Sequence, residues 1–206
     1  MSNYLTSKLI FSPDAILDPG GYNVMMEWEK DIMGEAASII CQNGGNILNI
    51  GFGMGFIDNY IQSNPHSTHW IIESHPDIQN KMKLEGWLDK PNVKCIFKPW
   101  QEVINILPKF DGVYYDTWAE PQPLAFFKQV HKLVKSKGIF SFFNNPALHN
   151  DYHVNEDCFI NPNEEALLKS NFDISFKSMK ITKDIPLNHY WPSDLKVYFT
   201  PICIRQ

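Results

Sequence analysis

Five short apolar segments alternate with segments of helical character through the middle of the chain, and this alternation limits the fold more than any other feature. The expected strands lie at 46–50, 69–73, 93–97, 112–115 and 138–143, and the expected helices between them at 56–63, 76–86, 100–107 and 123–134. Strands that are apolar on both faces are typical of parallel sheets covered by helices. The sequence therefore predicts a doubly wound α/β fold.

Both ends of the chain depart from this alternation. Apolar residues at helical spacing predict a first helix at 24–41, and the turn cluster at 18–21 separates it from an N-terminal arm, residues 1–23. After a further expected helix at 163–170, two long strands at 172–182 and 196–204 follow one another. Consecutive strands favour antiparallel pairing, so we expect them to close one edge of the sheet.

Composition and cysteine spacing exclude several classes of function. The 206 residues carry a formal net charge of −5, which argues against a DNA-binding protein, because such a protein needs a basic face. No apolar run is long enough to span a membrane, and four widely spaced cysteines form no zinc motif. His149 and His153 lack the glutamate of a zinc-protease motif. We therefore expect no metal, no DNA or membrane partner, and a cytoplasmic location that extends to the nucleus.

A glycine-rich segment follows the first strand of the alternation. Gly51, Phe52, Gly53, Met54 and Gly55 form a G-x-G-x-G pattern between that strand and the next helix. Glycines let the backbone turn tightly and approach a ligand closely, although an ordinary tight turn has the same composition. The dinucleotide fingerprint has a longer last gap, so the spacing favours S-adenosylmethionine (SAM), which has no pyrophosphate, over the nicotinamide cofactor of a dehydrogenase.

Polar residues follow the next three strands. Glu73 ends the second strand, 22 positions after Gly51, where a carboxylate accepts hydrogen bonds from ribose hydroxyls; a helix cap is the alternative. Trp100 and Gln101 follow the third strand, where an adenine edge would lie, and Trp100 suits the core equally well. Asp116 ends the fourth strand. It can meet a substrate cation or cap the next helix.

Glu29 lies at the border of the apolar stripe of the first expected helix. A glutamate is seldom buried without a partner. That partner is either a Lys or Arg of this chain or a cationic substrate, and the position alone does not choose between them.

Several segments, taken in order, resemble the guanidino-group methyltransferases. That family includes guanidinoacetate N-methyltransferase and the type IV protein arginine methyltransferase, which acts on the δ-nitrogen; the arginine branch is the more similar. The segments are Val24-Met25-Met26-Glu27-Trp28-Glu29, Leu48-Asn49-Ile50-Gly51-Phe52-Gly53-Met54-Gly55, Trp70-Ile71-Ile72-Glu73, His75-Pro76-Asp77, Tyr115-Asp116-Thr117, Phe140-Ser141-Phe142-Phe143-Asn144 and Pro201-Ile202-Cys203. Asn49 stands where many methyltransferases carry an acid.

The resemblance implies a fold and a set of site residues. The fold would be a class I SAM-dependent methyltransferase domain at 24–206, with a mostly parallel seven-stranded sheet, an antiparallel C-terminal strand and helices on both faces. Glu29 and Asp116 would be the catalytic acids that hold the guanidinium. The residues implied to bind SAM are Met25, Gly51, Phe52, Gly53, Met54, Gly55, Glu73, Ser74, Trp100, Gln101 and Asp116. The residues implied to bind substrate are Tyr22, Met26, Glu29, Asp116, Thr117 and Trp118.

The resemblance also implies an activity with two alternatives. The expected reaction is methyl transfer from SAM, with S-adenosylhomocysteine as product, to an arginine of a protein substrate; a ribosomal protein is one candidate. The first alternative is a small-molecule guanidino methyltransferase of the creatine-forming type, and the second is a SAM-binding scaffold without turnover. Fungal members of the arginine branch carry an ankyrin-repeat extension that is not among these 206 residues, so substrate recruitment stays open. A monomer and a homodimer are both compatible with the sequence.

Overall fold

The computed structural model contains a seven-stranded sheet and a separate three-stranded sheet. It describes residues 4–118, 124–145, 160, 162–186, 191–192 and 195–206. The strand order of the large sheet is β6-β5-β4-β7-β8-β10-β9. Its strands are β4 (Asn46–Ile50), β5 (Thr68–Ile72), β6 (Val93–Ile96), β7 (Phe110–Tyr115), β8 (Val134–Phe142), β9 (Phe172–Lys180) and β10 (Val197–Arg205).

The pairing confirms the predicted mixture of strand directions. β4 pairs in parallel with both β5 and β7, and parallel pairing continues from β5 to β6 and from β7 to β8. β10 is antiparallel to β8 and to β9. The last strand of the chain is therefore inserted antiparallel next to the edge, as expected for a class I methyltransferase fold.

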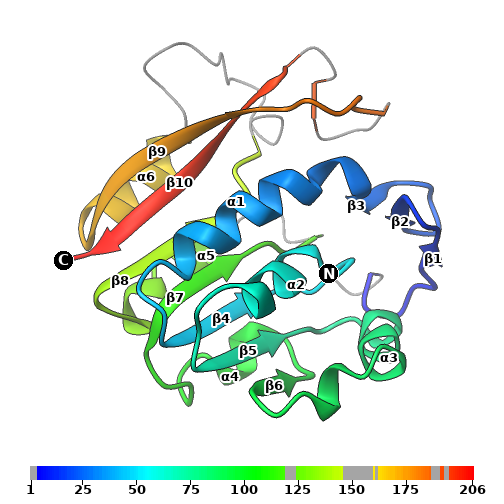
Figure 1. Cartoon of the computed structure of the whole chain (residues 1–206), viewed down its shortest axis with the longest axis horizontal. Helices are drawn as coiled ribbons and strands as arrows, with labels where there is room; N and C mark the ends of the chain where they lie inside the picture. The colour runs from blue at the N-terminus through cyan, green and yellow to red at the C-terminus, as the bar shows by residue number, and fades with distance from the viewer. Residues whose placement is uncertain (1–3, 119–123, 146–159, 161, 187–190, 193–194) are drawn as a thin grey trace.

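Helices cover both faces of the large sheet. One face carries α1 and α2, which lie toward the viewer in Figure 1 and whose apolar residues form a cluster with Ile47 and Tyr114. The other face carries α4, α5 and α6. The helix bounds are α1 (Lys30–Ile40), α2 (Phe56–Ser63), α3 (Pro76–Leu84), α4 (Trp100–Val103), α5 (Leu124–Phe127) and α6 (Pro162–Lys169).

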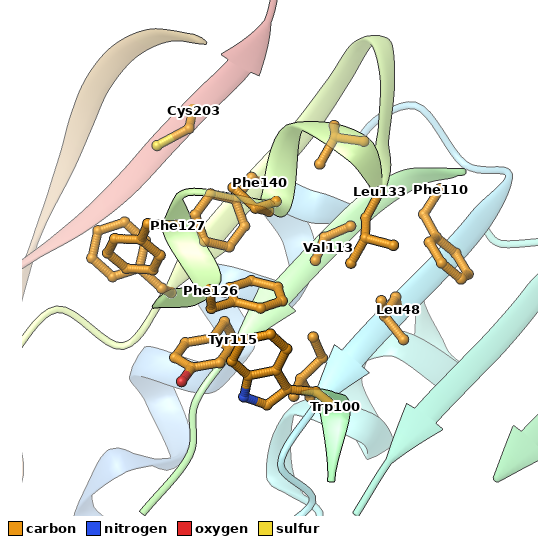
Figure 2. Packing of buried hydrophobic residues seen from close by; sticks show 14 of the residues in the cluster. Leu48, Trp100, Phe110, Val113, Tyr115, Phe126, Phe127, Leu133, Phe140 and Cys203 are labelled. Atoms are coloured by element: carbon orange, nitrogen blue, oxygen red, sulfur yellow. The ribbon is translucent and has the colours of Figure 1, made fainter. Parts of the chain in front are cut away.

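The aromatic core lies on the α4–α5 face. Tyr115 of β7 stacks on Phe126 of α5, with ring centroids 4.4 Å apart, and Trp100 packs edge-on against the same ring at 5.1 Å (Figure 2). All three side chains are buried. This packing anchors the end of β7, where Asp116 follows, against the start of α4.

The N-terminal end differs from the prediction. Residues 24–26 were expected to begin a helix, but they belong to β3 (Asn23–Met26), which pairs with β2 (Ala15–Leu17); β2 in turn pairs with β1 (Ile10–Phe11). A 3-10 turn, Glu27–Glu29, then leads into α1. The expected helix start was wrong because the apolar residues Met25 and Met26 are paired with Ile16 and Ala15. The arm expected at 1–23 contains β1, β2 and the first residue of β3.

Two further helices are shorter than expected. The one predicted at 100–107 is regular only over α4. In place of the one predicted at 123–134, α5 is followed by a 3-10 turn, Val130–Lys132, and β8 already begins at Val134. The early start of β8 follows from its parallel pairing, in which Val134 is the partner of Phe110.

We expect Gly112→Ala to destabilise the fold. A Cβ at this position of β7 would lie 2.1 Å from the backbone oxygen of Ile40, at the end of α1. The helix or the strand must shift, which lowers the free energy of unfolding by about 1–3 kcal/mol. Urea denaturation would measure the loss.

Gly34→Ala is the matched control for this change. The three atoms nearest to its Cβ would belong to the Tyr60 side chain, at 3.1–3.3 Å, and alanine is favoured over glycine inside a helix by about 1 kcal/mol. Equal losses in the two variants would contradict the close helix–strand packing at Gly112.

Candidate functional site

The predicted site residues follow the carboxyl ends of the central strands. The Asp116 N–H donates to the Ile50 carbonyl at 2.9 Å, and the Gly51 N–H donates to the Ile72 carbonyl at 2.9 Å. These bonds continue the ladders of β4 with β7 and of β4 with β5 by one residue. In open parallel sheets, ligands bind at this edge where the strand order reverses, and β4, with later strands on both sides, is that point.

The glycine loop approaches the neighbouring strand end very closely. Gly51 has φ = +94°, and a Cβ built on it would lie 1.8 Å from the Asp116 carbonyl oxygen. Only glycine fits this position. The loop also contacts β3, because the Met54 N–H lies 3.1 Å from the Met25 sulfur.

Glu73 is buried and held by backbone N–H groups. Its Oε2 accepts from the Phe52 N–H at 2.9 Å, and its Oε1 accepts from the His75 N–H at 2.7 Å. Burial raises the pKa of Glu73, and the backbone hydrogen bonds oppose that rise. The backbone groups of Gly53 and Ser74 oppose it as well. A carboxylate has about four acceptor sites, and a ligand's hydroxyls would share them with these backbone donors.

A largely apolar cavity opens beside this loop. It is lined by nine of the eleven residues implied to bind SAM: Met25, Gly51, Phe52, Gly53, Glu73, Ser74, Trp100, Gln101 and Asp116. The other two, Met54 and Gly55, lie in the same loop but do not line it. Of the residues implied to bind substrate, Thr117 and Trp118 also line the cavity.

The N-terminal segment covers part of the cavity, which the sequence did not indicate. Tyr4 and Leu5 line it. The Tyr4 ring lies between His75 and Trp118, with ring centroids 4.6 and 4.7 Å apart. The segment is fastened to the start of α3 by the Leu9 N–H, which donates to Asp77 Oδ2 at 2.9 Å.

Other lining residues were also missed. They are Val24, Met33, Ile50, Ile57, Ile72, Ile78, Lys98 and Pro99. Ile50 and Ile72 could have been found, because each directly precedes a predicted site residue. Val24 and Met33 come from β3 and α1, and no local pattern in the sequence places those elements beside the loop.

Glu29 and Asp116 act electrostatically on the same pair of tyrosines. Glu29 is 3% exposed, and its Oε1 accepts from the Met26 N–H at 2.6 Å. Burial raises the pKa of Asp116 to about 7. Burial also raises the pKa values of Tyr114 and Tyr198, and the negative charges of both acids raise them further. The two acids, 87 positions apart in the sequence, are thus close enough to the same two tyrosines for their charges to act on both. Asp116 lines the cavity, whereas Glu29 does not.

The remaining residues implied to bind substrate occupy different environments. Thr117 donates to the Tyr115 hydroxyl at 2.9 Å, and the Trp118 indole N–H donates to the Asn23 carbonyl at 2.8 Å. Met26 is buried, whereas Tyr22 is 55% exposed. Neither of these two lines the cavity.

The arrangement suits an adenosyl ligand next to a cation. Glu73 can accept hydrogen bonds from vicinal hydroxyls, and the apolar walls suit a purine ring and a thioether chain. Asp116 lines the same cavity, and its carbonyl oxygen lies against Gly51. A cation beside Asp116 would stabilise the ionised carboxylate there.

Metal ions and membranes receive no support from the described part of the chain. Within it, no group of three or more His, Cys, Asp or Glu side chains could hold a metal ion. Its helices are all too short or too polar to cross a membrane. His149 and His153 lie outside the described residues.

Solved structures of other proteins share the fold. Spermidine synthase from Thermotoga maritima matches with a TM-score of 0.64 at 12% identity, over 97% of this chain and 72% of its own. The precorrin-6y C5,15-methyltransferase from Geobacter metallireducens matches with a TM-score of 0.60 at 14% identity, over 85% of this chain and 89% of its own. Both matches concern the fold alone.

Sequence relatives are more specific. A protein named protein arginine N-methyltransferase 2 from Yarrowia lipolytica is 34% identical over 98% of this chain and 46% of its own length. The protein of that name from Saccharomyces cerevisiae is 42% identical over 68% of this chain and 37% of its own. The chain therefore spans about half the length, or less, of these relatives. The family model described as guanidinoacetate N-methyltransferase matches residues 8–206, and the chain belongs to that family.

Proposed function

We propose that this protein is a SAM-dependent methyltransferase that acts on a guanidino group, and that its acceptor is the δ-nitrogen of an arginine in a protein substrate. The observation that carries the proposal is a pair of acids whose negative charges both act on Tyr114 and Tyr198: Glu29, which is buried, and Asp116, which lines the cavity. Two carboxylates match the two terminal nitrogens of a guanidinium. The relatives named protein arginine N-methyltransferase 2 support the arginine acceptor.

The residues around the glycine loop would hold the methyl donor. Glu73 would accept hydrogen bonds from the ribose hydroxyls, and the backbone around Phe52 and Gly53 would lie against the ligand. Trp100 and Gln101 line the cavity at the position proposed for the adenine. When bound, SAM supplies an electrophilic methyl group.

The two acids would orient the acceptor. An arginine side chain is protonated at neutral pH, and its δ-nitrogen lone pair is delocalised. Paired hydrogen bonds from the terminal nitrogens to Glu29 and Asp116 would fix the plane of the group and draw positive charge toward those nitrogens. Fixing the attacking nitrogen in line with the methyl group lowers the barrier by several kcal/mol. One of the acids, or a water beside it, would accept the released proton.

A small guanidine is the second candidate acceptor, because the matching family model is described as guanidinoacetate N-methyltransferase. The same two acids would hold it.

We propose a cytoplasmic or nuclear location, where thiols such as the buried Cys41 and Cys203 stay reduced. A ribosomal protein remains the proposed example of a protein substrate.

The acceptor can be identified with methyl-labelled SAM. The purified protein is incubated with the label, cell protein extract and guanidinoacetate together, and mass spectrometry locates the label. We expect it on a protein arginine, with fragment ions that place it on the internal nitrogen. Label on guanidinoacetate would transfer the proposal to the small-molecule acceptor, and SAM binding without transfer would favour a scaffold.

Substitution of the acids should separate catalysis from donor binding. Glu29→Gln and Asp116→Asn keep the size of the side chains but remove the charges that hold the guanidinium. We expect each to lower kcat/KM about 100-fold or more and to leave the Kd for SAM within a few-fold. Steady-state kinetics and calorimetry measure these quantities.

Glu27→Gln is the matched control, because Glu27 lies two residues from Glu29 in the same turn and pairs with Lys183 at 2.8 Å. We expect near-normal turnover from this variant. Normal turnover in Glu29→Gln or Asp116→Asn would overturn the assignment of the acids.

The raised pKa of Asp116 predicts how its effect on stability changes with pH. The folded protein keeps the proton up to about pH 7, whereas the unfolded chain releases it near the ordinary value of 3.8. The unfolded state therefore binds fewer protons between these values, and the contribution of Asp116 to stability falls as pH rises from about 4 to about 7. Asp116→Asn lacks this carboxyl. The difference in melting temperature, variant minus wild type, should increase as pH rises from about 4 to about 7 and stay constant above that range. A difference that does not change with pH would contradict burial of the carboxyl.

A further inference from the structure

A buried polar chain lies next to the glycine loop, on the face of the sheet that carries α2. Asn49 of β4, Asp58 of α2 and His69 of β5 are all fully buried. The Asn49 carboxamide nitrogen donates to the two carboxylate oxygens of Asp58 at 2.9 and 3.0 Å. The same nitrogen donates to the Gly51 carbonyl at 2.9 Å. One side chain thus joins a buried carboxylate to the first glycine of the loop.

His69 lies against Asp58 from a second direction. The Gln62 carboxamide nitrogen lies 3.0 Å from His69 Nδ1. Because an amide nitrogen donates, Nδ1 is the acceptor, and the proton of a neutral ring is on Nε2. That nitrogen faces Asp58 Oδ1 at 3.0 Å. The carboxylate therefore accepts from the carboxamide of Asn49 on one side and lies against the His69 imidazole on the other, and it fixes the carboxamide of Asn49 in return.

Gly51 is the residue on which the site converges. Its N–H donates to the carbonyl of Ile72, which precedes Glu73, and its α-carbon lies against the carbonyl oxygen of Asp116. The next residue, Phe52, donates its N–H to Glu73. The orientation of the peptide that carries the Gly51 carbonyl therefore determines where the Phe52 N–H points.

We propose that Asn49 and Asp58 are positioning residues that hold the Gly51–Phe52 peptide, and with it the loop and Glu73, in the orientation that binds the methyl donor. The proposal rests on the proposed use of SAM by this cavity. It goes beyond that function because neither side chain lines the cavity, so both would act only through the loop.

The polarity of the pair matters for this role. A carboxylate at position 49 would turn an acceptor toward the acceptor oxygen of Gly51, and two buried carboxylates would face each other. A carboxamide at position 58 can donate to a carboxylate at position 49 and keep its oxygen beside His69. The double exchange Asn49→Asp with Asp58→Asn therefore restores the buried pair but not the donor to Gly51.

This difference gives a test in which stability and binding separate. We expect Asn49→Asp to lower both the melting temperature and the affinity for S-adenosylhomocysteine, measured by calorimetry. In the double exchange, most of the melting temperature should return while the affinity stays about tenfold below that of wild type, the usual effect of one lost hydrogen bond. Wild-type affinity in the double exchange would overturn the positioning role.

Ser141→Ala is the matched control for the loss of a buried polar group. Ser141 of β8 is fully buried and donates to the Pro201 carbonyl at 2.7 Å, away from the loop. We expect it to lower the melting temperature and leave the affinity unchanged. If affinity followed melting temperature in all variants, the effect would be structural only, and the proposal would fail.

Hydrogen exchange of residues 51–55 tests the same role without any ligand. Faster hydrogen exchange in the variant with both Asn49→Asp and Asp58→Asn than in wild type, at similar stability, supports positioning of the loop. Equal hydrogen-exchange rates overturn it. This result holds whether or not the wild type binds S-adenosylhomocysteine. If the wild type did not bind S-adenosylhomocysteine, the proposed function would be overturned, but the positioning role would not.

Discussion

The approach of Gly51 to the carbonyl oxygen of Asp116 is the constraint on which the site depends. A Cβ at Gly51 would lie 1.8 Å from that oxygen, so any side chain would push the end of β4 away from the end of β7. The two strand ends are also joined by the hydrogen bond from Asp116 to Ile50. The loop beside the cavity and the acid that faces it therefore form one rigid unit.

The buried acids are stabilised in different ways, and the difference matches their proposed roles. Burial raises the pKa of Glu73, and the backbone hydrogen bonds that it accepts from Phe52 and His75 offset part of that rise. For Asp116, burial is the cause that raises the pKa to about 7, so this carboxyl is partly protonated at neutral pH when the site is free. A bound cation would restore its charge. Under the proposed function, part of the specificity for a guanidinium would come from this incomplete stabilisation.

The sequence predicted the central part of the site because its signals are local. Gly51, Glu73 and Asp116 each follow an apolar strand, and parallel strands place their carboxyl ends at one edge. Tyr4 could not be predicted, because its position depends on contacts with His75, 71 positions away. The start of α1 was misplaced because apolar spacing does not distinguish a helical face from a strand such as β3, which is paired on one side. Asn49 was noticed, but its partner Asp58 lies on a different element, and the spacing does not reveal which face of α2 it occupies.

The misplaced helix start also explains how Glu29 reaches its position. The chain leaves β3 at Met26, and the Met26 N–H donates to Glu29 at the point where α1 begins. The N-terminus of a helix stabilises a negative charge, which favours a carboxylate at this otherwise apolar position. Asp116 has no such helix among the described residues and is affected mainly by burial. The fold therefore gives Glu29 a backbone donor and a helix N-terminus and leaves Asp116 to gain its charge with the ligand. Under the proposed function, a cation that contacts both acids would be bound more tightly than one that reaches Glu29 alone.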